Sequence, residues 1–276
     1  MGLILAPYIA PRQADSLRDA GVSWIDLSGN MAVRVGAGVY IERTGRPNQF
    51  PDTAPIKKVF QGTASLVARA LLLQPGGFSS LSDIVAFIQA RNGRIAVSTV
   101  SKVLRSLEEQ LLVSKSGPRI ASTDAAALLE RLAEGYAANG SRRQLRACRF
   151  AVENARQTIR EFCSTLDCSY IVCGFYAARL RGLAASAAMT MYVTDLERAK
   201  EAAGRLAGNC IPDEEFGQLR IMETRERTPW FNAQTVDEIR VVDEIELYLE
   251  MTVDTPRGPK VAALLRPRVL EARADE

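Results

Sequence analysis

The stretch RIAVSTVSKVLRSLEEQLLVSKSGPR, residues Arg94–Arg119, decides how the middle of the chain folds. Its apolar residues recur at helical spacing within a narrow arc of a helical wheel, and they are Val100, Val103, Leu104, Leu107 and Leu111. The polar residues on the opposite side are Ser98, Ser101, Lys102 and Arg105. The pattern predicts an amphipathic helix that begins at a capping Ser98 and ends near Gln110.

Two further helices and a hairpin are predicted around this helix. Ala64–Leu73 repeats apolar residues at helical spacing, and Ser80 with Asp83 three residues later has the spacing of a capping box. After the amphipathic helix, LLVSKSGPRIAS places two short apolar segments around a Lys-Ser-Gly-Pro-Arg tip, which favours a β-hairpin. Three helices followed by such a hairpin predict a winged helix-turn-helix domain over residues 55–140.

Positive charge is concentrated in the same segment. Between Ile56 and Ile120 the chain has nine basic and three acidic residues, a net charge of +6, whereas the remainder sums to −3. This asymmetry indicates a polyanionic partner, and hydroxyls and cations on one helix face can contact phosphates and base edges of double-stranded DNA. The predicted DNA-binding residues are Lys57, Lys58, Arg91, Arg94, Ser98, Thr99, Ser101, Lys102, Arg105, Lys115 and Arg119.

The flanking segments have different patterns. Residues 1–54 predict a small α/β domain, with a short helix from Pro11 and strands in VSWIDL, MAVRV and VYIERT, followed by the linker GRPNQFPDTAP. Residues 141–276 predict an α+β domain that opens with a long helix over Arg142–Leu166 and continues with alternating strands and helices. The predicted fold class is therefore α+β, in three domains.

Composition bounds the kind of protein. At 276 residues, 47% hydrophobic and 24% charged, the chain is long enough for two or three globular domains. We expect a cytoplasmic protein without membrane contact, because no apolar run approaches the roughly 20 residues of a membrane span and no targeting segment is recognisable. Five cysteines without a CxxC pair, and the lack of histidine, lead us to expect buried thiols, no metal, no cofactor and no catalytic residues.

Three stretches carry a resemblance to a known family. They are LILAPYIAPRQADSLRDAGVSWIDLSGNMAVRV with the following GVYIERTGRPN, the segment expected to form the winged helix, and VVDEIELYLEMTVDTPRGPKVAALLRPRVL near the end. Together they cover most of the chain. In these stretches it resembles the AbiEi-type antitoxins and related regulators of bacterial type IV toxin–antitoxin systems.

The resemblance implies a transcriptional regulator that binds its own promoter and has a cognate toxin as a possible partner. It also implies a carboxy-terminal domain similar to nucleotidyltransferases. An active core of that kind needs paired carboxylates to hold Mg²⁺. Here Asp195, at the end of a predicted strand, is taken as the single acid of such a core, so we expect the fold without the chemistry.

Two alternative functions come from other classes. A Mg²⁺-dependent nuclease would use Asp26 and Glu42, which end neighbouring predicted strands; Thr44 stands where such a site needs a lysine. A toxin-neutralising interaction module without DNA binding would use Trp230 and Phe231 as an exposed aromatic anchor, although core packing is the favoured role of these two residues.

A homodimer is a further expectation. A single winged helix contacts few base pairs, and two-fold related half-sites about one helical turn apart are the common solution. The amino-terminal domain or the predicted helix over Arg142–Leu166 would supply the interface.

Overall fold

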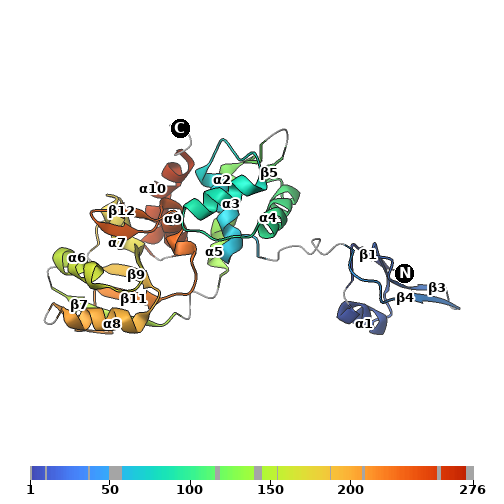
Figure 1. Ribbon diagram of the computed structural model, residues 1–276, viewed down its shortest axis with the longest axis horizontal. Coiled ribbons are helices and arrows are strands. Elements are labelled where there is room, and N and C mark those ends of the chain that lie inside the picture. Colours follow the sequence, from blue (N-terminus) through green and yellow to red (C-terminus); the bar gives the residue numbers. More distant parts are fainter. Residues whose placement is uncertain are drawn as a thin grey trace. The chain divides into compact units, whose positions relative to one another are not determined.

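The structure is a computed structural model that describes residues 2–9, 11–36, 38–49, 58–115, 119–139, 145–153, 155–186, 188–206, 209–253 and 256–271. It is a mixed α+β fold with several sheets, as the sequence predicts (Figure 1). The chain divides into two compact units, Met1–Ile56 and Lys57–Glu276. In the described ranges, no helix has the length and apolar character needed to cross a membrane.

The first unit is a four-stranded sheet with a helix on one face. Its elements are β1 (Leu3–Ala6), α1 (Pro11–Asp19), β2 (Ser23–Asp26), β3 (Met31–Val35) and β4 (Val39–Arg43), and the strand order is β1-β2-β3-β4. β1 and β2 are parallel and the other pairs are antiparallel. Ile9, Ala14, Trp24 and Ala32 form the core under α1. The predicted helix and three of the strands are confirmed, and β1 is an addition.

The opposite face of this sheet is apolar and open. The strand register places Ser23, Arg43 and eight apolar residues on the face away from Trp24, and the apolar ones are Leu3, Leu5, Ile25, Met31, Val33, Val35, Val39 and Ile41. Leu5 is 70% exposed and Ile41 is 50% exposed. An alternating strand normally presents polar residues to water, so this face has the character of a contact surface.

The second unit begins with a helical segment that ends in a hairpin. Its elements are η1 (Gly62–Ala64), α2 (Ser65–Leu73), α3 (Leu81–Ala90), α4 (Val97–Glu109), β5 (Val113–Ser114), β6 (Ala121–Ser122) and α5 (Ala125–Ala137). The predicted cap of α3 is confirmed, because the Ser80 hydroxyl accepts a hydrogen bond from the Asp83 N–H at 3.1 Å. The predicted cap of α4 is wrong: Ala96 occupies the N-cap and Ser98 lies inside the first turn.

A seven-stranded mixed sheet and five helices complete the second unit. The elements are β7 (Ala147–Val152), α6 (Ala155–Thr165), β8 (Tyr170–Cys173), α7 (Gly174–Leu180), β9 (Met189–Val193), α8 (Leu196–Arg205), β10 (Cys210–Pro212), β11 (Leu219–Glu223), η3 (Thr228–Trp230), β12 (Gln234–Val236), β13 (Ile239–Val241), α9 (Glu244–Val253) and α10 (Gly258–Glu271). The strand order is β10-β7-β11-β9-β8-β13-β12.

The long helix predicted over Arg142–Leu166 is wrong in its first half. Residues Ala147–Val152 form strand β7, which pairs antiparallel with β10 and β11. Cys148 and Phe150 alternate with more exposed neighbours, which is the period of a strand and not of a helix. Only Ala155–Thr165 is helical, so the dimer interface predicted on a long helix has no such helix to use.

A buried ion pair joins the helical segment to the sheet. The Arg69 guanidinium on α2 lies 2.6 Å from a Glu246 carboxylate oxygen on α9, and the two side chains are 2% and 0% exposed. Tyr136 on α5 donates its hydroxyl to the other Glu246 oxygen at 3.3 Å. These contacts make the helices and the sheet parts of one body, in which α9 and α10 lie beside α2 and α5 (Figure 1).

We predict that Arg69→Met destabilises the second unit severely. The change strands a buried negative charge, so the free energy of unfolding should fall by about 3–5 kcal/mol, and Glu246→Leu in the same chain should restore much of the loss. Arg131→Met is the matched control, because its ion pair with Glu134 is exposed and should contribute less than about 1 kcal/mol. Urea unfolding measures all four proteins, and equal losses in the Arg69 and Arg131 variants would refute the prediction.

The buried carboxyl of Asp243 should make the free energy of unfolding depend on pH. Burial raises the pKa of this carboxyl from 3.8 to about 6, against the opposing effect of the Arg69 charge. The folded state therefore binds the proton more tightly than the unfolded state, and the stabilisation present at low pH is lost as the pH rises towards about 6. Relative to Asp243→Asn, the wild-type free energy of unfolding should fall by roughly 2–3 kcal/mol from pH ~4 to pH ~7. Parallel stability profiles of the two proteins would contradict this.

Candidate nucleic-acid interface

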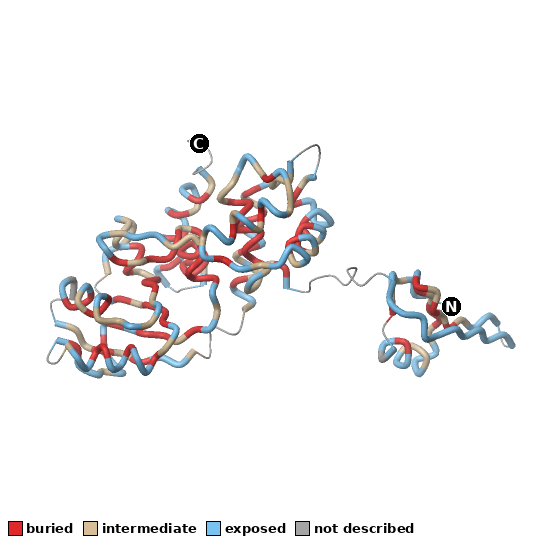
Figure 2. The backbone as a smooth tube through the Cα atoms, in the orientation of Figure 1, coloured by how far each residue is buried: buried red, intermediate tan, exposed pale blue. Residues whose placement is uncertain are grey.

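Helix α4 buries one side completely and exposes the other. Val100, Val103, Leu104 and Leu107 are 0% exposed against the neighbouring helices and hairpin. Ser98, Ser101 and Arg105 are exposed on the outer side, and Thr99 and Lys102 are half-buried. Figure 2 shows buried and exposed stretches alternating along the tube of this helix. The structure therefore brings the residues predicted on this helix onto one accessible face.

The amino-terminal end of α4 lacks a side-chain cap. Ala96 at the N-cap offers no side-chain oxygen, whereas Ser80, Asp124 and Asp195 cap their helices. The Thr99 N–H donates to the Ala96 carbonyl at 3.0 Å, whereas Val97 and Ser98 at this end of the helix are exposed. An uncapped and exposed helix amino terminus is a favourable position for a phosphate oxygen.

Most of the basic residues predicted to contact DNA already have partners. Lys115 pairs with Glu108 at 2.8 Å, and Arg105 pairs with Glu109 at 3.5 Å. The Arg91 guanidinium lies 3.5 Å from the centroid of the Phe87 ring. Arg119 donates to the Gly76 carbonyl at 2.8 Å, which ties the hairpin to the loop between α2 and α3.

Lys58 and Arg94 are exposed, and in the described ranges neither side chain has an ion pair. Lys57 and the hairpin tip at residues 116–118 lie outside the described residues. The candidate interface therefore consists of the outer face of α4, with Lys58, Arg94 and the two ends of the hairpin around it.

The turn before α4 is fixed against the carboxy-terminal part of the unit. The Asn232 N–H donates to the Arg91 carbonyl at 2.9 Å. Gly93 fits between Ile88 and Phe231, since a Cβ at this position would lie 2.4 Å from Ile88 Cγ2 and 3.2 Å from Phe231 Cδ2. Phe231 is 0% exposed and Trp230 is 8% exposed, so neither is an exposed anchor for a partner, and the core-packing interpretation is confirmed.

The two carboxylates of the nuclease alternative have separate structural contacts. Asp26 accepts hydrogen bonds from the N–H groups of Ile9 and Asn30 and from the Asn30 amide at 2.8–3.2 Å. Burial alone would raise the pKa of Asp26, but these hydrogen bonds outweigh it and leave the pKa below its ordinary value. Glu42 lies two strands away and contacts Arg18 and the Tyr40 hydroxyl. Asp26 therefore orders a turn, and Glu42 makes surface contacts on another strand.

The second unit contains a cavity of about 510 Å³ above Gly174. Thr190, Tyr192 and Arg220 line it, and Glu250 is the acidic residue of its described lining. Glu250 accepts the Gly174 N–H at 2.9 Å. Asp195 lies elsewhere and caps α8 by accepting the N–H groups of Glu197 and Arg198 at 3.1 Å. The described lining thus offers one carboxylate where metal-dependent nucleotidyl transfer needs a pair.

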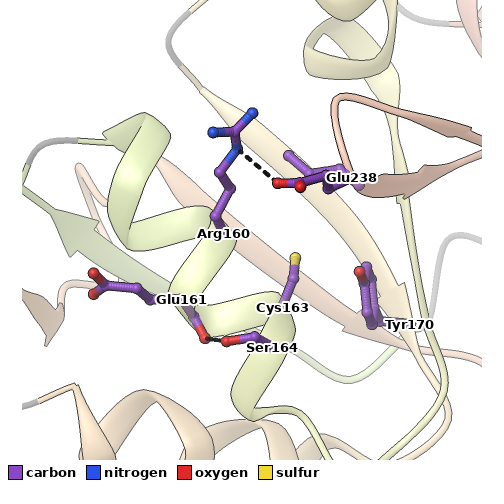
Figure 3. Close-up of a pocket in the computed structure, with 7 residues that line it drawn as sticks. Arg160, Glu161, Cys163, Ser164, Tyr170 and Glu238 are labelled. Atoms are coloured by element: carbon purple, nitrogen blue, oxygen red, sulfur yellow. Dashed lines mark hydrogen bonds and ion pairs between the residues drawn. The ribbon is translucent and has the colours of Figure 1, made fainter.

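A smaller cavity of about 320 Å³ contains Cys163 and Tyr170 (Figure 3). Burial raises the pKa of each of these two groups to about 12. Arg160 on α6 faces Glu238 across the opening at 4.0 Å. A thiol with so high a pKa is a poor nucleophile, which agrees with the expectation that the cysteines are small buried residues; Cys168 alone among the five is half-buried.

Comparison with known proteins gives no relative for this chain: no family model, no curated protein and no solved structure matches it. The interface described above is therefore interpreted from its own residues and geometry.

Proposed function

We propose that this chain is a sequence-specific transcriptional regulator that binds double-stranded DNA through a winged helix-turn-helix. The observation that carries the proposal is the outer face of α4, where hydroxyls and cations are accessible while Val100, Val103, Leu104 and Leu107 on the other side are buried. In this proposal α3 and α4 form the helix-turn-helix and α4 enters the major groove.

The hairpin supports the same proposal. β5 and β6 pair antiparallel directly after α4, and a bridge between Phe78 and Ile120 adds the loop before α3 as a third short segment. Gly77 allows this close approach, because its φ is +71° and a Cβ there would lie 2.6 Å from the Ile120 carbonyl oxygen. A wing held in this way would stand beside the recognition helix and contact the adjacent backbone.

The ion pairs that Arg105 and Lys115 already form do not prevent these cations from binding DNA phosphates. The pairs of Arg105 with Glu109 and of Lys115 with Glu108 lie at the surface, where such pairs contribute little free energy. A DNA phosphate can replace a carboxylate at small cost, and each neutralised phosphate makes binding more sensitive to salt. The neighbouring acids Glu108 and Glu109 also restrict where a phosphate can bind, since they repel a phosphate that comes close to them instead of to the cations.

The biological role is proposed as antitoxin-like and autoregulatory, with a cognate toxin as a partner and a cytoplasmic location. The carboxy-terminal domain would then have a nucleotidyltransferase-like fold without activity. The single carboxylate in the described lining of the cavity above Gly174 is in keeping with this. The alternative of a metal-dependent nuclease is weaker, because Asp26 is occupied by its own turn.

We predict that Arg105→Ala lowers the affinity for specific DNA by roughly 10- to 100-fold if Arg105 contacts a base edge, because a good base contact contributes about 1–3 kcal/mol. Affinity for random duplexes should change by no more than a factor of about three. Fluorescence anisotropy at several salt concentrations, with duplexes from the region upstream of the chain's own gene and with scrambled duplexes, measures both.

Arg131→Ala is the matched control for this measurement. Arg131 lies in another 13-residue helix and has an exposed ion pair one turn away, with a side-chain exposure of 52% against 60% for Arg105. Its removal should leave both affinities unchanged. Equal affinity of the wild type and Arg105→Ala for every duplex would mean that this face of α4 is merely solvated.

Self-association is a second candidate property, and the open apolar face of the first sheet favours it. Two copies would give the two half-sites that a dimeric regulator needs, and residues such as Leu5 and Ile41 would be covered at their contact.

We predict that Leu5→Glu with Ile41→Glu converts a dimer into a monomer, because the change places four carboxylates at the contact between two copies. Light scattering after gel filtration gives the mass of each protein. Thr235→Glu, at an exposed position in the other unit, is the control and should leave the mass unchanged. A monomeric wild type at every concentration would exclude this use of the face.

A further inference from the structure

A second, larger cavity lies between the turn before α4 and one edge of the seven-stranded sheet. Its volume is about 710 Å³, within the range of small-molecule sites. The turn contributes Asn92, Gly93 and Arg94. The sheet contributes Ser169 before β8, Thr194 and Thr224 after β9 and β11, the following Arg225–Arg227, Trp230, and Arg240 on β13; Gln89 on α3 completes the lining.

The charge of this cavity is strongly positive. Four arginines line it, Arg94, Arg225, Arg227 and Arg240, against one acid, Glu226. Glu226 is engaged with the Asn139 amide at 3.3 Å. Over the described ranges, none of the four guanidinium groups has an ion pair or a hydrogen bond. Arg94, Arg225 and Arg227 are exposed and Arg240 is half-buried, so water screens part of their repulsion, and a bound anion would remove more of it.

A buried donor points to the same conclusion. Trp230 is 8% exposed, and its indole N–H has no hydrogen-bond partner in the described structure. A buried N–H without a partner carries a desolvation penalty, and native proteins rarely leave one unexplained. Trp230 is one of the residues that line the cavity, so a ligand inside it would lie beside this unsatisfied donor.

The floor of the cavity is ordered by hydrogen bonds between strand ends. The Thr194 N–H donates to the Ser169 carbonyl at 3.0 Å, and the Thr224 N–H donates to the Val193 carbonyl at 3.0 Å. The Thr224 hydroxyl accepts the Glu226 N–H at 3.1 Å. β9 and β11 are parallel, so their carboxyl ends meet at this edge, a usual ligand position in sheets with parallel strands.

We propose that this cavity binds a small phosphorylated ligand of nucleotide size, with the arginines on its phosphates and the Trp230 N–H as a further donor. Planar guanidinium groups match phosphate oxygens in pairs, and the larger part of the lining is polar. A DNA backbone is the weaker alternative, because a rigid duplex does not reach a donor that is nine-tenths buried. The proposal does not depend on DNA binding by α4.

Isothermal titration of the full chain with ATP, inorganic pyrophosphate and adenosine tests the proposal directly. ATP and pyrophosphate should bind and adenosine should not, because the recognised groups are phosphates. No heat with either phosphate compound at about 1 mM would overturn the proposal, since a specific site of this charge should bind more tightly than that.

Single-residue variants test whether ATP binds in this cavity. Arg225→Ala and Arg240→Ala should each weaken ATP binding about tenfold, and Trp230→Phe should do so by a similar factor through loss of one donor to a charged group. Because Trp230 is also packed in the core, Trp230→Phe should lower the melting temperature, and ATP affinity is compared well below it. Arg220→Ala is the control: this exposed arginine lies on β11 but lines the other cavity, and its removal should change nothing.

Two results would overturn the assignment even if ATP binds. Unchanged affinity in both Arg225→Ala and Arg240→Ala, or an equal loss in Arg220→Ala, would place the ligand elsewhere. Displacement of ATP by duplex DNA, with a matching loss of DNA affinity in Arg225→Ala, would assign the arginines to the DNA backbone instead.

Discussion

The ion pair between Arg69 and Glu246 is the constraint on which the second unit depends. Both groups are removed from water in the folded protein. If α2 and α9 separate, either both charges must become hydrated or one must remain buried without its partner, which is unfavourable. Tyr136 donates to the same carboxylate, and the buried Asp243 accepts the Glu246 N–H. The helical segment therefore has a fixed position on the sheet, and the turn before α4 inherits that position through Phe231 and Asn232.

Local patterns predicted the elements well because their causes are local. The valine and leucine spacing of α4 and the Ser80 cap of α3 depend on residues within a few positions of each other. Strand β7 was missed because its partners, β10 and β11, lie far along the chain, and polar residues on both sides of a short alternating run resemble a helix. Ser98 was assigned as a cap because a serine favours that position, but the preceding Ala96 already has extended backbone angles.

In the candidate site, too, features that depend on neighbouring residues were predictable and features that depend on distant residues were not. The sequence identified which residues of α4 face outward, since helical periodicity decides it. It gave no sign that Arg119 contacts Gly76, 43 residues earlier, or that Arg91 stacks on Phe87. The arginine-lined cavity was not predicted at all, because the segments that form it are separated by up to 150 positions and only the fold of the sheet brings them together.

The turn Asn92–Arg94 lines the cavity and leads into α4. This closeness decides whether the two ligands would favour or oppose each other's binding. A phosphorylated ligand in the cavity and a DNA phosphate at the uncapped start of α4 would be anions attracted by overlapping positive potential, including the charge of Arg94. Each would screen that potential for the other. Because coupling between two binding sites is reciprocal, the ligand would weaken DNA binding by the factor by which DNA weakens the ligand. Gly93 is tightly packed, so the turn has little room for a compensating movement. The electrostatic effect therefore decides whether the two ligands favour or oppose each other's binding.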